Sequence, residues 1–178
     1  MTTAVEARVP EHGRQAVSPL PTEFERLFRA EYPRVVRVAY RVLGDEAAAE
    51  DVAQEVFLSF YRAHPATADY AAAWLHAAAA HTALNALRSR GRRATREGAQ
   101  AIRYDAASPD PVEAVAAAET RAEVRAILAR LSDRDAALLA LRHAGLSYAE
   151  IAAAIDVRAS SVGTLLRRAE DAFRREMT

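Results

Sequence analysis

The sequence predicts an all-α protein with two small helical domains joined by a linker. Ala, the strongest helix former, is abundant, and Gly residues and β-branched runs are few. Apolar residues recur at helical spacing in one stretch after another. Between 94 and 110 this spacing fades into mixed charge, a Gly and a Ser-Pro pair. That change indicates a flexible linker between domains at 22–93 and 111–178.

Composition excludes several classes of protein. The chain has no Cys, so disulfides and thiolate zinc sites are excluded, and its five His residues share no metal-ligand spacing. The sequence carries no paired acid and base and no Gly-rich phosphate loop, so we expect no enzyme, no metal and no cofactor. It carries no signal segment and no membrane-spanning run, so a cytoplasmic protein without membrane insertion is expected.

The formal net charge is zero, yet the charges are unevenly distributed. Every basic side chain apart from His is Arg, whose planar guanidinium suits phosphate and guanine. One segment gathers the basic residues Arg88, Arg90, Arg92, Arg93 and Arg96. Another gathers the acidic residues Asp45, Glu46, Glu50, Asp51 and Glu55. Two segments of opposite charge suggest two different partners.

The front of the chain is expected to be an arm followed by a long helix. Residues 1–21 have three Pro and no periodicity, which is typical of a disordered terminus. A helix is predicted from Glu23 to Gly44, with Thr22 as its N-cap. Pro33 is expected to kink this helix or to split it in two.

An acidic helix is predicted from Asp45 or Glu46 to about Ala63. Its core face consists of two rows, Val52, Val56 and Phe60 beside Ala53, Phe57 and Tyr61. The opposite face carries Glu50, Asp51, Gln54, Glu55 and Leu58. An apolar anchor in a charged rim is typical of a partner-binding helix. A solvated acidic face with one stray Leu gives the same pattern.

Residues 64–70 are predicted to form a loop, and a third helix is predicted from about Ala71 to Ser89. The residues expected to pack inward are Trp74, Leu75, Ala78, Leu84 and Leu87. A polar stripe at helical spacing consists of His81, Asn85, Arg88 and Arg92. Such a stripe suits phosphate and base contacts, and Arg can stack on an unpaired base. It is also the pattern of an ordinary exposed helix face.

After the linker, Asp110 is the predicted cap of a helix that begins at Pro111 and ends at about Arg130. Its apolar set is Val112, Val115, Val124, Ile127, Leu128 and Leu131. Ser132 is expected to cap a further helix, which Gly145 ends.

The stretch from Leu146 to Arg168 predicts a helix-turn-helix. Ser147 and Glu150 can form a capping box, and Asp156 sits in the turn, where a left-handed backbone is expected. The second helix is predicted to end at Arg174 or Arg175, with Val162, Leu165 or Leu166, Ala169 and Phe173 on its inner side. The second helix of this motif enters the DNA major groove, although an ordinary helical hairpin shares the spacing.

From Phe24 to Arg175 the chain resembles the two-domain, extracytoplasmic-function (group IV) sigma factors of bacterial RNA polymerase. The first half of the family's promoter-melting domain, region 2, is similar to FERLFRAEYPRVVRVAYRVLGDEAAAEDVAQEVFLSFYR, and AEDVAQEVF is its most specific part. The helix that reads and melts the −10 element is similar to WLHAAAAHTALNALRSRGRR. The C-terminal domain, region 4, is similar to LSDRDAALLALRHAGLSYAEIAAAIDVRASSVGTLLRRAEDAFRRE.

The resemblance implies three sets of binding residues. The coiled coil of the polymerase β′ subunit would be gripped by Glu50, Asp51, Gln54, Glu55 and Leu58. The −10 element would be contacted by Trp74, His81, Asn85, Arg88, Arg90 and Arg92, beside a loop at 64–70 that captures a flipped-out base. The −35 element would be contacted from the helix-turn-helix at 147–168 by Arg158, Ser160, Ser161, Thr164, Arg167 and Arg168. Region 4 would also touch the polymerase β flap.

This sequence departs from the family pattern in both DNA-reading helices. The family often has a basic residue and Asn where Ala80 and His81 stand, which shifts the expected contact with melted DNA toward Asn85, Arg88 and Arg90. The family commonly has Gly where Asp156 stands, and Lys-Ser-Arg at 163–165, where this chain has Gly-Thr-Leu.

The implied function is a non-catalytic factor that docks on core RNA polymerase and directs promoter recognition and transcription initiation. An anti-sigma factor is left open as a further partner. Two alternatives remain: a stand-alone helix-turn-helix regulator, and a helical adaptor that binds a protein and no DNA.

Overall fold

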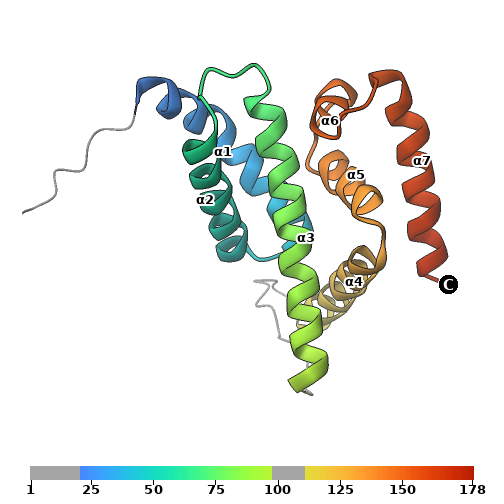
Figure 1. The fold of residues 1–178 in the computed structure, drawn as a ribbon. Helices are drawn as coiled ribbons and strands as arrows, with labels where there is room; N and C mark the ends of the chain where they lie inside the picture. The colour runs from blue at the N-terminus through green and yellow to red at the C-terminus, as the bar shows by residue number, and fades with distance from the viewer. Residues whose placement is uncertain (1–20, 98–110) are drawn as a thin grey trace, which may run out of the picture.

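The structure, a computed structural model, describes residues 21–97 and 111–178. Helices make up most of these two ranges and no strand occurs within them, which confirms the all-α class. In Figure 1 the long helix α3 (Ala71–Glu97) runs through the middle, with α1 (Thr22–Leu43) and α2 (Glu46–Ala63) on one side and the later helices on the other. The predicted arm, apart from Pro21, and the linker from 98 to 110 lie outside the described residues.

Helix α1 begins one residue earlier than predicted and is uninterrupted. Pro21 occupies the N-cap and no side chain caps the helix, so the prediction of Thr22 as the cap is wrong. Pro33 lies inside the helix, so of the two predicted outcomes the split is wrong and the kink stays a prediction. Pro removes one backbone hydrogen bond, but Val35 and Val38 just beyond it are fully buried, and this packing holds both halves in one helix. Gly44 follows the helix with a left-handed φ of 67°.

Helix α2 has the predicted bounds and nearly the predicted core. Asp45 is the N-cap, and its Oδ1 accepts a hydrogen bond from the Ala48 amide at 2.7 Å. The buried residues of the two rows are Val52, Ala53, Val56, Phe57 and Phe60. Tyr61 was expected in the core and is 46% exposed. It lies at the margin of the face, where its ring packs edge-on against Phe24 of α1 at 4.8 Å between centroids.

Helix α3 is longer than predicted. It passes the expected end at Ser89, continues through Gly91 and the Arg cluster, and ends at Glu97. Gly inside a helix costs only about 1 kcal/mol, and the neighbouring Arg residues are good helix formers. The first four residues of the predicted linker are therefore helical. Leu75 and Leu84 are buried as expected, whereas Trp74, Ala78 and Leu87 are half-buried.

Helices α4 (Pro111–Arg130) and α5 (Asp133–His143) follow the predicted bounds. Ser132 caps α5, and its Oγ accepts from the Asp135 amide at 3.1 Å. In α4 the buried members of the predicted apolar set are Ile127 and Leu128, with Leu131 buried just beyond its end. Val124 is 37% exposed, so its assignment to the core is wrong. Neighbouring helices bury only the C-terminal end of the described part of α4. The predicted cap Asp110 and the side chains of Val112 and Val115 lie outside the described residues.

The helix-turn-helix is present as predicted, built from α6 (Tyr148–Ala154) and α7 (Ala159–Glu176). The capping box is complete: Ser147 Oγ accepts from the Glu150 amide at 3.3 Å, and Glu150 Oε2 accepts from the Ser147 amide at 2.8 Å. Asp156 takes the expected left-handed conformation in the turn, with a φ of 53°. The buried residues of α7 are Val162, Leu166 and Ala169, and the helix ends one residue later than predicted.

The two helical units contact each other. Helix α3 packs against α4, α5 and α6 as well as against α1 and α2, and α1 also reaches α5. The buried apolar side chains of both units form one connected cluster. Within the described part of the chain, no helix combines the length and apolar character that a membrane span requires.

Candidate protein- and nucleic-acid-binding surfaces

The first candidate surface is the acidic face of α2, defined as Glu50, Asp51, Gln54, Glu55 and Leu58. All five residues are exposed, as the periodicity predicts, and Leu58 is 48% exposed. Tyr32 of α1 lies close to Glu50 and Gln54 of this face. Burial and the nearby Glu50 carboxylate raise the pKa of Tyr32. An exposed Leu among carboxylates can dock on a surface that is apolar and basic.

The second candidate surface begins at the loop 64–70 with a group of aromatic side chains. The half-buried Trp74 packs against Phe60, with ring centroids 5.4 Å apart, and against His64 at 4.8 Å. The Tyr70 hydroxyl lies 3.3 Å from His64 Nδ1. These contacts hold the loop against α2 and α3 and leave part of the Trp74 ring accessible. A partly exposed aromatic ring beside a loop can stack on an unpaired base.

The polar stripe of α3 is exposed at His81, Asn85 and Arg92 but not at Arg88, and the neighbouring Arg90 is half-buried. The side chain of Arg88 is only 19% exposed, because its guanidinium binds the corner between α4 and α5. Its Nε donates to the Ala129 carbonyl at 3.1 Å, its Nη2 donates to the Leu131 carbonyl at 3.0 Å, and its Nη1 pairs with the Asp133 carboxylate. No local spacing predicts this contact, because its partners lie more than forty residues away in the chain.

The third candidate surface is the outer face of α7. The exposed members of the predicted set are Arg158, Ser160, Thr164, Arg167 and Arg168, and Ser161 is half-buried. Guanidinium and hydroxyl donors thus share an open helix face, which is the arrangement that contacts phosphates and base edges.

Two further groups lie beside this face and were missed by the sequence reasoning. Arg134 of α5 lines an open hollow together with Arg158 and Ser161. Arg142 lies 5.6 Å above the centre of the exposed Tyr148 ring, and a Cβ at Gly163 would lie 3.5 Å from that ring. Their place follows from the packing of α5 and α6 on α7, which no local pattern reveals.

Comparisons with known proteins agree with this geometry. Residues 27–93 match the Sigma-70 region 2 family, and residues 121–172 match the Sigma-70, region 4 family. The chain is 32% identical over 170 residues to the ECF RNA polymerase sigma factor SigE of Mycolicibacterium smegmatis. It is 33% identical over 153 residues to the RNA polymerase sigma-H factor of Pseudomonas aeruginosa, which covers 79% of this chain and 78% of that protein. The chain belongs to the extracytoplasmic-function sigma factors of RNA polymerase.

The similarity to these sigma factors differs in extent. The match to the SigE protein covers 91% of this chain but spans only 63% of that relative's length. Among solved structures, the sigma factor RpoE from Bartonella quintana, crystallised with the anti-sigma factor NepR, aligns with a TM-score of 0.51. That alignment covers 88% of this chain and 98% of the other, at 17% identity, so it supports the fold alone.

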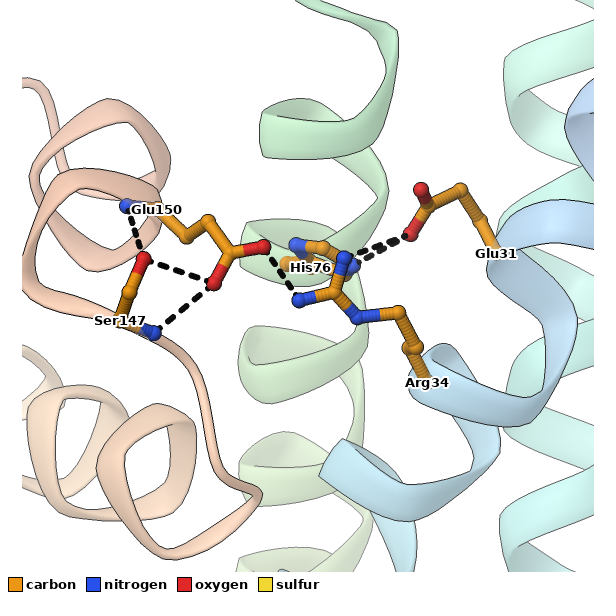
Figure 2. Close-up of polar contacts among 5 residues, drawn as sticks. All are labelled: Glu31, Arg34, His76, Ser147 and Glu150. Atoms are coloured by element: carbon orange, nitrogen blue, oxygen red, sulfur yellow. Dashed lines mark hydrogen bonds and ion pairs between the residues drawn. The ribbon is translucent and has the colours of Figure 1, made fainter.

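In this sigma factor, polar residues also join the region 2 unit to the region 4 unit. Figure 2 shows Glu31 and Arg34 of α1, His76 of α3 and the capping box of α6 meeting at one place. Arg34 pairs with Glu150, and His76 Nε2 lies 2.9 Å from Glu31 Oε2. The Glu150 carboxylate therefore serves two partners, the Ser147 cap and Arg34. Hydrogen bonds from Ser147, together with Arg34, lower its pKa to about 2, so it is ionised at neutral pH.

Proposed function

We propose that this sigma factor docks on core RNA polymerase through the acidic face of α2 and directs promoter recognition and transcription initiation. In this proposal α3 and the loop 64–70 contact the −10 element, and α7 contacts the −35 element. The observation that carries the proposal is that one chain exposes two surfaces of opposite chemistry, the acidic face of α2 and the Arg-bearing outer face of α7. The matches to region 2 at 27–93 and to region 4 at 121–172 support the proposal, because the first range contains the acidic face and the second contains the outer face of α7.

A neutral protein can select DNA in this way because it does not act alone. Core polymerase supplies much of the non-specific attraction to phosphate. Docking also makes each promoter contact an intramolecular event, so neither DNA contact needs to be tight. Extruding a base costs a few kcal/mol, and stacking of the base near Trp74 offsets this cost.

The acidic face is tested by reversing two of its charges. Asp51→Arg combined with Glu55→Arg should abolish co-purification with core polymerase and run-off transcription, because both carboxylates lie in the rim around Leu58. Both residues are exposed, so helicity and melting temperature should change little.

The matched control is Glu119→Arg combined with Glu123→Arg, which makes the same charge change at the same i, i+4 spacing on exposed positions of α4. The control should retain both activities. Full polymerase binding by the Asp51/Glu55 variant would rule out the acidic face as the docking surface.

The recognition helix is tested by replacing Arg167 and Arg168 with Ala. Promoter-dependent run-off transcription with core polymerase should fall severalfold or more, since each lost phosphate or base contact costs about 1–3 kcal/mol. Co-purification with core polymerase should persist. Unchanged transcription would favour the adaptor that binds no DNA.

A gel-shift assay without polymerase distinguishes the stand-alone regulator from the sigma factor proposal. It predicts a sequence-specific shift of duplex DNA by the free chain. The sigma factor proposal predicts little or no shift until core polymerase is added.

An anti-sigma factor is a further partner to test. The Bartonella sigma factor, which shares this fold, was crystallised with one. Affinity capture from a cell that encodes this chain, followed by a transcription assay with the captured protein, tests whether it has a comparable inhibitor.

A further inference from the structure

Besides the apolar cluster that they share, the two promoter-reading units are joined by polar clamps at two places. At one, each of the three guanidinium nitrogens of Arg88 donates to the α4–α5 corner, to the carbonyls of Ala129 and Leu131 and to Asp133. At the other, Arg34 binds Glu150 at the start of the helix-turn-helix (Figure 2). Both Arg residues come from the region 2 unit, and the partners named above belong to the region 4 unit. Arg34 also lies 3.8 Å from the Glu31 carboxylate of its own helix.

This arrangement is too compact for both promoter elements. Elements named −10 and −35 are about 25 base pairs apart, which corresponds to about 85 Å of duplex at 3.4 Å per pair. A compact chain of this length has a radius of gyration of about 16 Å. The region 4 unit must therefore leave α3 before α3 and α7 can each occupy their element.

Arg88 connects this movement to DNA binding. It follows His81 and Asn85 on the polar stripe of α3, yet the α4–α5 corner covers it, and its side chain is 19% exposed. The corner engages three of the five N–H donors of Arg88 and covers most of its side chain, so a phosphate can reach the whole guanidinium only after the corner has moved away. His81 and Asn85 remain exposed, so the competition concerns Arg88 itself.

We propose that the contact between the two units is autoinhibitory, and that Arg88 is a shared group which binds either the α4–α5 corner or the phosphates of −10 DNA. The proposal rests on the proposed function, since it names a regulation of the same −10 surface. The contact between the two units, called closure below, and DNA binding at Arg88 are then thermodynamically linked, and each weakens the other by the same factor. DNA that captures Arg88 removes one clamp and favours release of region 4.

Closure can be measured directly because the chain has no Cys. Two introduced cysteines, Ala47→Cys on α2 and Arg175→Cys on α7, are exposed and carry a donor and an acceptor dye without competing thiols. The opening variant is Arg34→Glu with Asp133→Arg, which reverses one charge in each clamp and changes no proposed DNA contact. The control is Arg37→Glu with Glu123→Arg, which makes the same kinds of charge change at exposed positions.

The first readout is energy transfer in the full chain without polymerase. Transfer should be high in the wild type and in the control, and should fall in the opening variant. Equal transfer in the wild type and the opening variant would overturn the proposal. If the double reversal fails to fold, Asp133→Ala alone serves instead, because that side chain is 69% exposed and its loss takes the carboxylate from Arg88.

The second readout is affinity for a random-sequence single-stranded DNA oligonucleotide, measured by fluorescence anisotropy. Freeing Arg88 should raise the affinity of the opening variant at least about fivefold over the control, the lower end of the usual coupling between two linked sites. Opening without any gain in affinity would overturn the proposal.

A third variant asks whether Arg88 itself is shared. Arg88→Ala should lower energy transfer, as the opening variant does, but should give no gain in DNA affinity. If Arg88→Ala gained as much DNA affinity as the opening variant, the region 4 unit would only cover the DNA-binding surface of α3. That result would overturn the shared role of Arg88. Failure of the proposed function would appear separately, as loss of polymerase binding and run-off transcription in the wild type.

Discussion

At the scale of single residues, His76 is the most unusual group in the structure. It is a titratable side chain that is only 1% exposed, and its Nε2 lies 2.9 Å from Glu31 Oε2. Burial lowers its pKa below the ordinary 6.5, although the Glu31 carboxylate acts in the opposite direction. Between the folded pKa and 6.5, the unfolded chain binds a proton that the folded chain does not, so stability rises with pH across this window.

We therefore expect the free energy of unfolding, measured in urea, to decrease from about pH 7.5 to about pH 5.5. His76→Gln should show a smaller decrease, because Gln keeps a polar group near Glu31 and does not titrate. His81→Gln is the matched control, because it makes the same substitution at an exposed position of the same helix. Glu150 does not interfere, because a pKa of about 2 places its contribution between pH 4.5 and 2. Identical pH dependences in all three proteins would contradict the assignment to His76.

At the scale of elements, α7 combines a recognition face with a residue that weakens the helix. Gly163 lies in its second turn, under the Tyr148 ring. A Cβ at this position would meet the ring at 3.5 Å, an ordinary van der Waals distance, so nothing in the packing requires Gly. If α7 contacts the −35 element as proposed, a Gly without a packing role is expected where the backbone approaches a phosphate closely.

Gly163→Ala should raise the free energy of unfolding by about 0.5–1 kcal/mol, the usual advantage of Ala over Gly inside a helix. Gly145→Ala is the contrasting control, because its φ of 90° strains any L side chain and the substitution should destabilise the protein. Thermal and urea unfolding of both variants measure these opposite signs. A loss of stability in Gly163→Ala would mean that the Tyr148 contact is tighter than the structure indicates.

At the scale of the whole molecule, the sequence predicts what is decided locally. The capping box of Ser147 and Glu150, the left-handed Asp156 and the cap at Ser132 depend on groups within a few residues, and all three are present. The wrong predictions concern edges: Tyr61 and Val124 lie where one neighbouring helix decides burial, and Thr22 lost the cap position to Pro21.

The contacts between the two units could not be read from the sequence. Arg34 and Glu150 are 116 residues apart, and nothing in the local spacing of either predicts a meeting. The same holds for Arg88, which its periodicity placed on a solvent-facing stripe and the α4–α5 corner covers. The exposure of the acidic face was predictable because it needs only one amphipathic helix, whereas an interface needs the arrangement of several.

Glu150 binds both the Ser147 cap and Arg34, and this constrains which residues relatives can have at this position. Asp is a methylene shorter and cannot serve both Ser147 and Arg34, whereas Gln preserves the capping box and gives up the charge. A relative with Gln here would keep the capped helix-turn-helix intact, but its region 2 and region 4 units would separate more easily. The residue that a relative has at this position therefore predicts whether its two helical units stay in contact in the free protein.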